Sequence, residues 1–407
     1  MRRAWPVLAA VVVLTGCTGT PPAPVAPSDP VPSRTAASAA ALPGTPTGPP
    51  TADRPATTPP SGPLPGAPSV RVVERWVLPA GQEVAGVALA GDTLAFSGCR
   101  PCGGAAHDAA ALYLTRRGEV PRVVARTGFR WGTTAVVGLD ATALVWLDEA
   151  DVRDAAGQAP RWALRALDRR SGRTWTVAEG GGGAGLPRTP VAFVHAGAVS
   201  WQVYDIVTSR GPVFSADLRT RRSRRLTADL PGLLRGVVDQ GLVVVARRSP
   251  APTVVPDGPA PADAYLVPAA TAQLLALTSS HDVEDVSVSG QDVVWRTRPE
   301  DGESLWRGTT TGDAPRRLYG ASVLTAAAGP GFGVWITREA APVVQAGAGG
   351  RVVTLPDVPA DGGGLAVDGT GPRDAASEAL RVAVLTVPGR GVPGPLGVAV
   401  VEVRSGG

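Results

Sequence analysis

The sequence predicts an all-β protein that forms a single β-propeller, and two observations lead to this prediction. From Ser69 onward, short runs of Val, Leu, Ala and Trp alternate with Gly, Asp and Arg turns, and no apolar stripe of helical spacing exceeds two turns. Within this region a unit recurs at a mean spacing of about 48 residues. That spacing, with four short strands in each unit, is typical of propeller blades.

The first element of each repeat is a short apolar strand that ends in a large residue. Its copies are DTLAF (92–96), TALVW (142–146), GAVSW (197–201), GLVVV (241–245), QDVVW (291–295), GFGVW (331–335) and LRVAV (380–384). Four of them end in Trp146, Trp201, Trp295 and Trp335. We expect these aromatic side chains to fill the gaps between neighbouring blades.

The second element is a strand, a tight turn and another strand, as in ALRALDRRSGRTWTVAE (163–179). The last copy is split, because GVAVVEVRSGG (397–407) ends the chain and RVVERWVLPAG (71–81) begins the folded region. We therefore predict seven four-stranded blades, closed by an N-terminal strand that pairs with the C-terminal blade. Such closure removes the sheet edges that a linear array would expose.

Two stretches carry a family resemblance. SADLRTRRSRRLTAD (215–229), and SGQDVVW (289–295) upstream of SLWRGTTTGDAPRRLYG (304–320), resemble the repeats of TolB-like propellers, a WD-repeat-like architecture. The resemblance spans residues 69–407 and implies the propeller fold. The Ser-Pro-Asp-Gly signature of that family is missing here, and seven units are counted where TolB itself has six.

The N-terminus has the features of an export signal. Arg2 and Arg3 precede an apolar run, and Leu14-Thr15-Gly16-Cys17 follows it, which resembles the lipobox of bacterial lipoproteins. The apolar run is shorter than the roughly 20 residues of a membrane-spanning helix. We expect residues 1–16 to be a signal peptide and Cys17 to carry diacylglycerol, which places the protein at the extracytoplasmic face of the cell membrane.

Residues 17–68 are nearly all Pro, Thr, Ala, Ser and Gly, and we expect a disordered tether between the lipid and a propeller at 69–407. The 407-residue chain contains neither Lys nor Asn, which indicates a GC-rich coding bias, as in many actinobacteria. Without Arg2 and Arg3 of the signal, the chain has 37 Arg and 35 acidic residues. This near balance gives no electrostatic case for nucleic acid, and we expect a monomer.

Cys99 and Cys102 lie in FSGCRPCGG (96–104), in the expected loop between the second and third strands of the first blade. An exported protein favours a disulfide between them. Two alternatives stay open: a zinc site that adds His107, and a redox couple, which is less compatible with a β-hairpin loop. No cofactor is otherwise implied, although a metal ion is compatible with the sequence.

Further candidate residues lie in loops and turns. One expected partner-binding face carries acidic residues after TALVW together with a histidine that enters the fifth blade: Asp148, Glu149, Asp151, Asp154 and His281. A basic arc is expected at the turns between the third and fourth strands of three consecutive blades: Arg116, Arg117, Arg169, Arg170, Arg221, Arg222, Arg224 and Arg225. Two interpretations stay open. The arginines are solvated charges that block pairing of strand edges, or they bind anionic lipid headgroups or an acidic envelope polymer.

Catalytic signatures are sparse. The sequence has no Gly-x-Ser-x-Gly elbow, no Walker loop and no His-Glu-x-x-His. We therefore expect a module that binds or scaffolds a protein or envelope polymer. The alternative is an envelope enzyme, of hydrolase or lyase type, that uses carboxylates such as Asp140, Asp239 and Asp285 or a metal at the central face of the propeller.

Overall fold

The computed structural model describes most of residues 69–404. The undescribed stretches within that span are 78–82, 101–107, 128, 130–131, 151–160, 182–189, 206–207, 248–261, 269–272, 281, 299–302, 321–322, 330–331, 338–341, 347–350, 355–359, 368–378 and 387–396. The chain divides into two units, Met1–Ser61 and Gly62–Gly407, and the described residues belong to the second.

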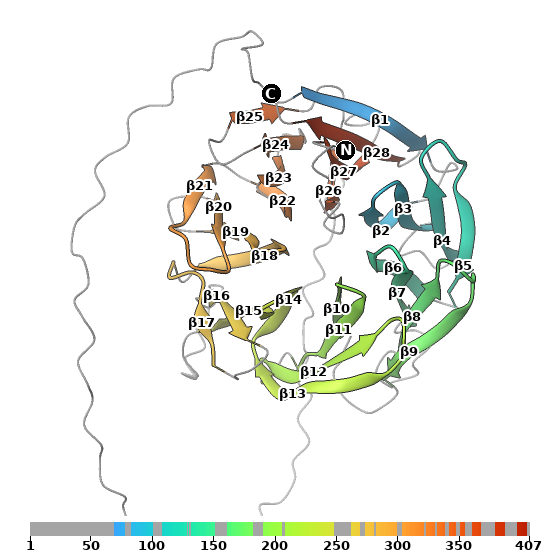
Figure 1. Ribbon diagram of the computed structural model, residues 1–407, viewed down its shortest axis with the longest axis horizontal. Coiled ribbons are helices and arrows are strands. Elements are labelled where there is room, and N and C mark those ends of the chain that lie inside the picture. Colours follow the sequence, from blue (N-terminus) through green and yellow to red (C-terminus); the bar gives the residue numbers. More distant parts are fainter. Residues whose placement is uncertain are drawn as a thin grey trace, which may run out of the picture. The chain divides into compact units, whose positions relative to one another are not determined.

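In the part of the chain that the structure describes, the strands form seven four-stranded antiparallel sheets around a common axis (Figure 1). Six sheets consist of four consecutive strands each, which we call a, b, c and d from the axis outward. The remaining sheet is composite and combines strands from both ends of the described region. Each blade therefore places one strand at the axis.

Blades 1 to 3 come first along the chain. Blade 1 contains β2 (Glu83–Ala90), β3 (Thr93–Arg100), β4 (Asp108–Arg116) and β5 (Arg122–Arg126). Blade 2 contains β6 (Gly132–Leu139), β7 (Ala143–Ala150), β8 (Trp162–Asp168) and β9 (Thr174–Gly180). Blade 3 contains β10 (Pro190–His195), β11 (Ala198–Val203), β12 (Arg210–Asp217) and β13 (Ser223–Pro231).

Blades 4 to 6 follow the same order. Blade 4 contains β14 (Leu233–Val238), β15 (Gly241–Arg247), β16 (Ala262–Pro268) and the two-residue β17 (Leu275–Ala276). Blade 5 contains β18 (Val283–Ser289), β19 (Asp292–Thr297), β20 (Ser304–Thr309) and β21 (Arg316–Tyr319). Blade 6 contains β22 (Val323–Gly329), β23 (Phe332–Thr337), β24 (Pro342–Ala346) and β25 (Arg351–Thr354).

Blade 7 is the composite sheet. It contains β26 (Ala360–Val367), β27 (Ala379–Thr386), β28 (Gly397–Arg404) and, as its outermost strand, β1 (Ser69–Val77). β1 pairs antiparallel with β28, with Ser69 opposite Arg404, so this sheet is the split unit of the sequence. Both ends of the described region are thereby held in one sheet, and β1 covers the edge that β28 would otherwise expose.

A buried charged cluster joins blade 7 to blade 1. Arg381 of β27, 8% exposed, donates to the carbonyl of Gly91 at 2.5 Å and lies 3.4 Å from Glu74 of β1. Arg117 of blade 1 reaches Glu402 of β28 at 3.2 Å. Burial raises the pKa of Glu74, and the nearby guanidinium groups of Arg381 and Arg117 partly oppose this. The ring is thus closed by ion pairs between blades 7 and 1 as well as by the backbone hydrogen bonds between β1 and β28.

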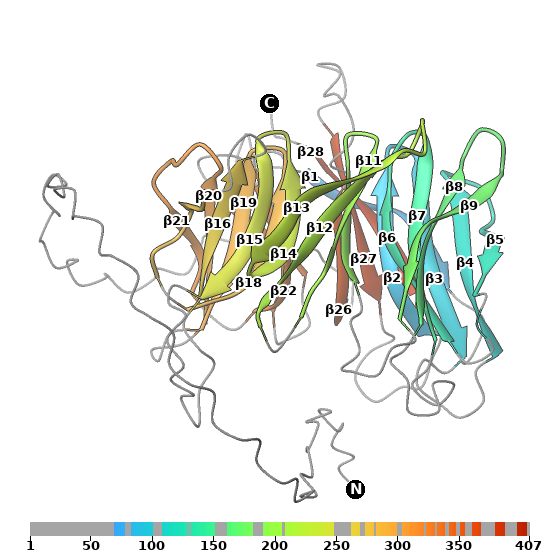
Figure 2. The ribbon, with the colours of Figure 1, turned by 90° about the horizontal axis from the view of Figure 1, so that it is seen from below.

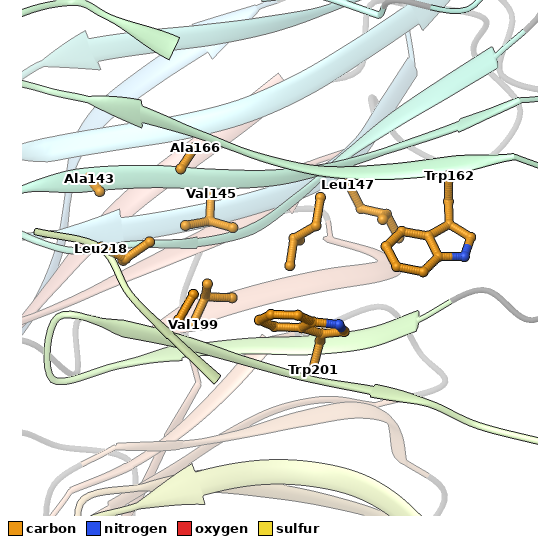
Figure 3. Packing of buried hydrophobic residues seen from close by; sticks show 10 residues of the cluster. Ala143, Val145, Leu147, Trp162, Ala166, Val199, Trp201 and Leu218 are labelled. Atoms are coloured by element: carbon orange, nitrogen blue, oxygen red, sulfur yellow. The ribbon is translucent and has the colours of Figure 1, made fainter. Parts of the chain in front are cut away.

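The four repeated tryptophans lie in the seams between blades, as predicted. Trp146, Trp201, Trp295 and Trp335 are 4% exposed or less. Trp201 of blade 3 packs with Val145 and Leu147 of blade 2, together with Trp162 from β8 (Figure 3). Large apolar side chains therefore fill the space between twisted neighbouring sheets.

Two faces follow from the antiparallel order of the strands. The a–b and c–d turns lie on one face, which we call the turn face, and the b–c and d–a connections lie on the other, the loop face. The turn between β8 and β9 lies on the upper side in Figure 2. Because β28 ends at the turn face and Ser69 pairs with its last residue, the chain enters the propeller at the turn face.

Candidate functional site

A cavity of about 630 Å³ lies on the axis, between the inner strands of the blades. Its wall is mostly apolar and contains Val137, Val194, Val237, Val288 and Ala328. Five of the seven inner strands supply these residues (β6, β10, β14, β18 and β22), and β2 and β26 contribute others. This cavity, which we call the channel, therefore has a mostly apolar wall.

Two glycines let the inner strands approach each other closely. A Cβ added at Gly138 would lie 2.7 Å from the Cβ of Val194, and one added at Gly236 would lie 2.1 Å from Cγ2 of Val288. Both glycines follow a register shift, between Val136 and Gly138 in one strand and between Leu234 and Gly236 in the other. The missing side chains are what allows tight contact beside these bulges.

The ionisable groups near the axis are paired or hydrogen-bonded. Arg235 of β14 lies 3.3 Å from Asp285 of β18, toward the loop face. At the turn face, Nε2 of His195 lies 2.8 Å from Oδ1 of Asp239, which joins blade 3 to blade 4. Oδ1 of Asp140 accepts from the backbone N–H groups of Thr142 and Ala143 at 2.7 and 2.8 Å. These carboxylates order turns and inner strands.

The cysteine site cannot be located within the described residues. The backbone of Cys99 belongs to β3, but its side chain is outside the described part of the structure. Cys102 and His107 lie wholly outside the described residues. The disulfide, zinc and redox hypotheses therefore stay predictions. Among the side chains that are described, no group of three or more His, Cys, Asp or Glu residues is placed to hold a metal ion.

The acidic residues were predicted in a loop, and for two of them this is wrong. Asp148 and Glu149 lie within β7, because the strand continues to Ala150. Asp148 is fully buried; its carboxylate accepts from the hydroxyl of Thr134 at 2.7 Å and pairs with Arg165 at 2.9 Å. It therefore stabilises blade 2 from inside. Asp151, Asp154 and His281 lie outside the described residues.

Of the predicted basic arc, the c–d turns on the turn face carry Arg117, Arg169, Arg170, Arg221 and Arg222, while Arg116 ends β4 and Arg224 and Arg225 lie within β13. Half of these arginines make contacts within the propeller. Arg117 pairs with the acidic residues of blade 7. Arg169 is half-buried and donates to the Asp140 carbonyl and the Thr93 hydroxyl, and desolvation lowers its pKa.

Two further arc residues are also engaged. The guanidinium of Arg221 lies 4.6 Å from the ring centroid of Trp175 in blade 2. Arg225 donates to the carbonyls of Thr227 and Ala228 at 3.3 and 2.7 Å. Arg116, Arg170, Arg222 and Arg224 are exposed. Some arginines of the arc therefore contact a neighbouring blade, and others form an exposed basic surface.

A second cavity, of about 620 Å³, opens between blades 3 and 4 next to the channel, and sequence reasoning missed it. Its lining includes Ser200, Ser215 and Arg224 from blade 3 and Leu242 and Val267 from blade 4. His195 lines both this cavity and the channel. The sequence contained one sign of this cavity: GAVSW has a serine at the position where TALVW and QDVVW have valine.

Comparisons with solved structures return β-propeller proteins. TolB from Acinetobacter baumannii is 12% identical over 73% of this chain and 61% of its own, with a TM-score of 0.39. The acylaminoacyl peptidase of Pyrococcus horikoshii is 7% identical over 74% of this chain and 57% of its own, with a TM-score of 0.46. The propeller domain of the Trilobed protease from Pyrococcus furiosus is 9% identical over 68% of this chain and 98% of its own, with a TM-score of 0.44.

These similarities concern the fold. The chain covers less than two thirds of the TolB and peptidase chains. No family model and no curated protein matches the sequence. Within the described residues, no helix has the length and apolar character needed to cross a membrane.

Proposed function

We propose that this protein is a lipoprotein, anchored through Cys17 at the extracytoplasmic face of the cell membrane, whose β-propeller binds or scaffolds a protein or cell-envelope partner. The order of Arg2 and Arg3, an apolar run and Thr15-Gly16-Cys17 supports the anchor. The Pro- and Thr-rich segment 18–68 supports a tether of about 40 Å between lipid and propeller.

The character of the axial channel supports binding over catalysis. A propeller enzyme of the alternative class needs carboxylates or metal ligands that converge on the axis. The wall of the channel is instead mostly apolar, while Asp285 and Asp239 each face a basic side chain and Asp140 orders a turn. This arrangement is the observation that carries the proposal.

The turn face is proposed to face the membrane. The chain enters the propeller on this face at Ser69, and the exposed arginines Arg170 and Arg222 lie at turns on the same face. Anionic headgroups attract such basic clusters over about a Debye length, which is roughly 8–10 Å in physiological salt. The loop face then points outward, toward the proposed partner.

Anchoring is tested with Cys17→Ser in a GC-rich actinobacterial host supplied with labelled palmitate. We expect the parent chain to incorporate label and to sediment with membranes, and the Cys17→Ser chain to do neither. Cys99→Ser is the matched control and retains both properties. Equal labelling of the parent chain and the Cys17→Ser chain would refute the lipobox assignment.

The orientation is tested with Arg170→Glu/Arg222→Glu and vesicles of phosphatidylcholine with or without phosphatidylglycerol. Charge reversal is expected to remove the salt-sensitive part of binding to the anionic vesicles. Arg161→Glu is the control, because Arg161 is an exposed arginine at the loop face. Binding that is unchanged by the double substitution and insensitive to salt contradicts the orientation.

Partner binding is tested by cross-linking the tagged full chain in intact cells. We expect one envelope component to be recovered in stoichiometric amount with the parent chain. The same component should be recovered with Arg170→Glu/Arg222→Glu, because the proposed partner binds the loop face. Recovery of no component above an untagged control would contradict a scaffolding role.

A further inference from the structure

The cavity between blades 3 and 4 is built on one polar row that crosses three strands. Ser200 of β11 is opposite Ser215 of β12, and Ser215 is opposite Arg224 of β13. The neighbouring residues Val199 and Trp201 pack in the seam with blade 2. Because side chains alternate along a strand, Ser200, Ser215 and Arg224 point toward blade 4, where the cavity lies.

The equivalent b–c pairs are apolar in five of the other six blades. They are Ala95–Leu114 in blade 1, Val145–Ala166 in blade 2, Val243–Leu266 in blade 4, Val334–Val344 in blade 6 and Ala383–Val400 in blade 7, while blade 5 pairs Val294 with Arg307. Blade 3 has a serine at both positions. These serines replace packing side chains with two hydroxyl groups.

Blade 2 fills this space with an aromatic ring, whereas blades 1 and 5 have Arg122 and Arg316 at the same position of the outer strand. The row of blade 2 continues from Val145 and Ala166 to Trp175 of β9, whose indole packs against the seam with blade 3. In blade 3 the residue in the place of Trp175 is Arg224. Seam 2–3 is therefore filled by an aromatic ring, and seam 3–4 is hollow at its turn-face end.

The chemistry of the hollow combines an apolar wall with donors for an anion. Leu230, Leu242, Val267 and Pro268 form apolar parts of the lining. The hydroxyl of Ser200 donates to that of Ser215 at 3.1 Å, so the pair has one hydroxyl proton left to donate outward.

Most charged groups of the lining have partners, and Arg224 differs from them. Asp229 pairs with Arg210 at 2.7 Å, and Asp239 pairs with His195 at 2.8 Å. Arg225 donates to backbone carbonyls. Arg224 is exposed, and no hydrogen bond or ion pair of its side chain is seen within the described part of the chain. The guanidinium of Arg224 is therefore the group of the lining that is available to an anion.

We propose that this cleft binds a small amphiphilic anion: a flat apolar body that occupies the space that the indole of Trp175 fills in blade 2, carrying a carboxylate or sulfonate that receives hydrogen bonds from Arg224 and the serine pair. The cavity volume falls within the range of small-molecule sites, about 300–1,000 Å³. This site does not depend on the membrane anchor or on the loop-face partner.

The test uses the full chain with Cys17→Ser, so that no lipid or detergent competes for the probes. The anionic probe is 8-anilinonaphthalene-1-sulfonate, and its neutral counterpart is N-phenyl-1-naphthylamine, both followed by fluorescence titration. Arg224→Gln should weaken the anionic probe about tenfold, as expected for loss of a hydrogen bond to a charged group, and leave the neutral probe nearly unchanged. Arg222→Gln, two residues away and outside the cleft lining, is the matched control.

A second variant fills the cleft with the residues of blade 2. Ser200→Val/Ser215→Ala/Arg224→Trp should abolish binding of both probes while circular dichroism and thermal unfolding stay cooperative. Saturable binding that survives this variant overturns the proposal, and so does an equal effect of Arg224→Gln and Arg222→Gln. If the triple variant fails to fold, the comparison of the two single glutamine variants alone decides.

Discussion

Seams 2–3 and 3–4 have the same backbone arrangement and differ in their contents. In seam 2–3, Val145 and Ala166 pack with Val199 and Trp201 in one apolar cluster (Figure 3), and Trp175 packs against this cluster. In seam 3–4 the packed part contains Val213, Leu234 and Val244, and the turn-face end is hollow. The two seams thus differ in the three side chains of one cross-strand row, which are Val145, Ala166 and Trp175 in blade 2 and Ser200, Ser215 and Arg224 in blade 3.

The largest effect is expected from the filled seam. Trp201→Ala removes a side chain that is 4% exposed and packed against blade 2. We expect it to lower the free energy of unfolding by about 3–5 kcal/mol, because the surrounding sheets cannot close the void. Urea unfolding followed by circular dichroism measures this. A loss below about 1 kcal/mol would mean that the seam relaxes and that its packing is not tight.

Exchanging single residues between the two seams tests the comparison directly. Val145→Ser places a hydroxyl in the filled seam and should cost about 2–3 kcal/mol, from lost packing and an unsatisfied polar group. Ser200→Val faces the cleft and should change stability by less than about 1 kcal/mol. Similar costs for both substitutions in urea unfolding would show that the seams are energetically alike.

Sequence reasoning succeeded where the blades repeat. The tryptophan positions and the split blade were found because each is one instance of a spacing that recurs along the chain. Burial of Trp146 and Trp335 follows from that spacing, since the same strand position faces a seam in each blade.

The missed features are departures from the repeat. Ser200 and Ser215 lie side by side only because β11 pairs with β12, and the register of that pairing cannot be derived from a single sequence. Asp148 was placed in a loop because acidic residues at the end of an apolar run usually mark a turn. The strand continues through it, since Arg165 on β8 supplies a partner for the buried carboxylate.

A smaller effect is expected at the turn that covers seam 2–3. Arg221 has a φ of 59°, and the position at the same place in the blade 2 turn is Gly172, with a φ of 69°. Arg221→Ala loses the contact with Trp175, worth about 0.5–1 kcal/mol, and keeps a side chain in the left-handed region. Arg221→Gly loses the same contact but relieves about 1 kcal/mol of backbone strain.

The two substitutions at Arg221 should therefore differ in thermal unfolding, with glycine the more stable. Arg222→Ala, the exposed neighbour, serves as the control and should leave the melting temperature unchanged. If Arg221→Ala is as stable as Arg221→Gly, the left-handed conformation carries no cost and the stacking on Trp175 stands alone.

The smallest effect concerns the turns themselves, which are alike in the two blades. Backbone N–H donors hold the pKa of Asp168 and of Asp217 below its ordinary value, Ser171 contributing most to the first and Thr220 to the second. A carboxylate whose pKa is lowered by folding stabilises the native state above its unfolded value, near 3.8, and this contribution is lost as the pH falls through the folded value.

Glu74 acts with the opposite sign. Its pKa is raised by burial, so through this group the native state gains stability as the pH falls through the raised value toward 4.5. The parent profile therefore sums opposing contributions, and the difference between variant and parent is the quantity to measure. Asp217→Asn keeps an acceptor oxygen but does not titrate, so its stability should fall less than that of the parent below about pH 4.

Asp168→Asn should shift the acid limb of the unfolding profile to a similar extent, since its Oδ1 accepts from the same two positions of the turn, at 2.9 and 3.0 Å, as that of Asp217 does at 3.0 and 2.6 Å. Equal shifts would place the whole difference between the two seams in the row of Ser200, Ser215 and Arg224. Unequal shifts would extend that difference to the turns, and the cleft would then depend on how the blade 3 hairpin is held as well as on what lines it.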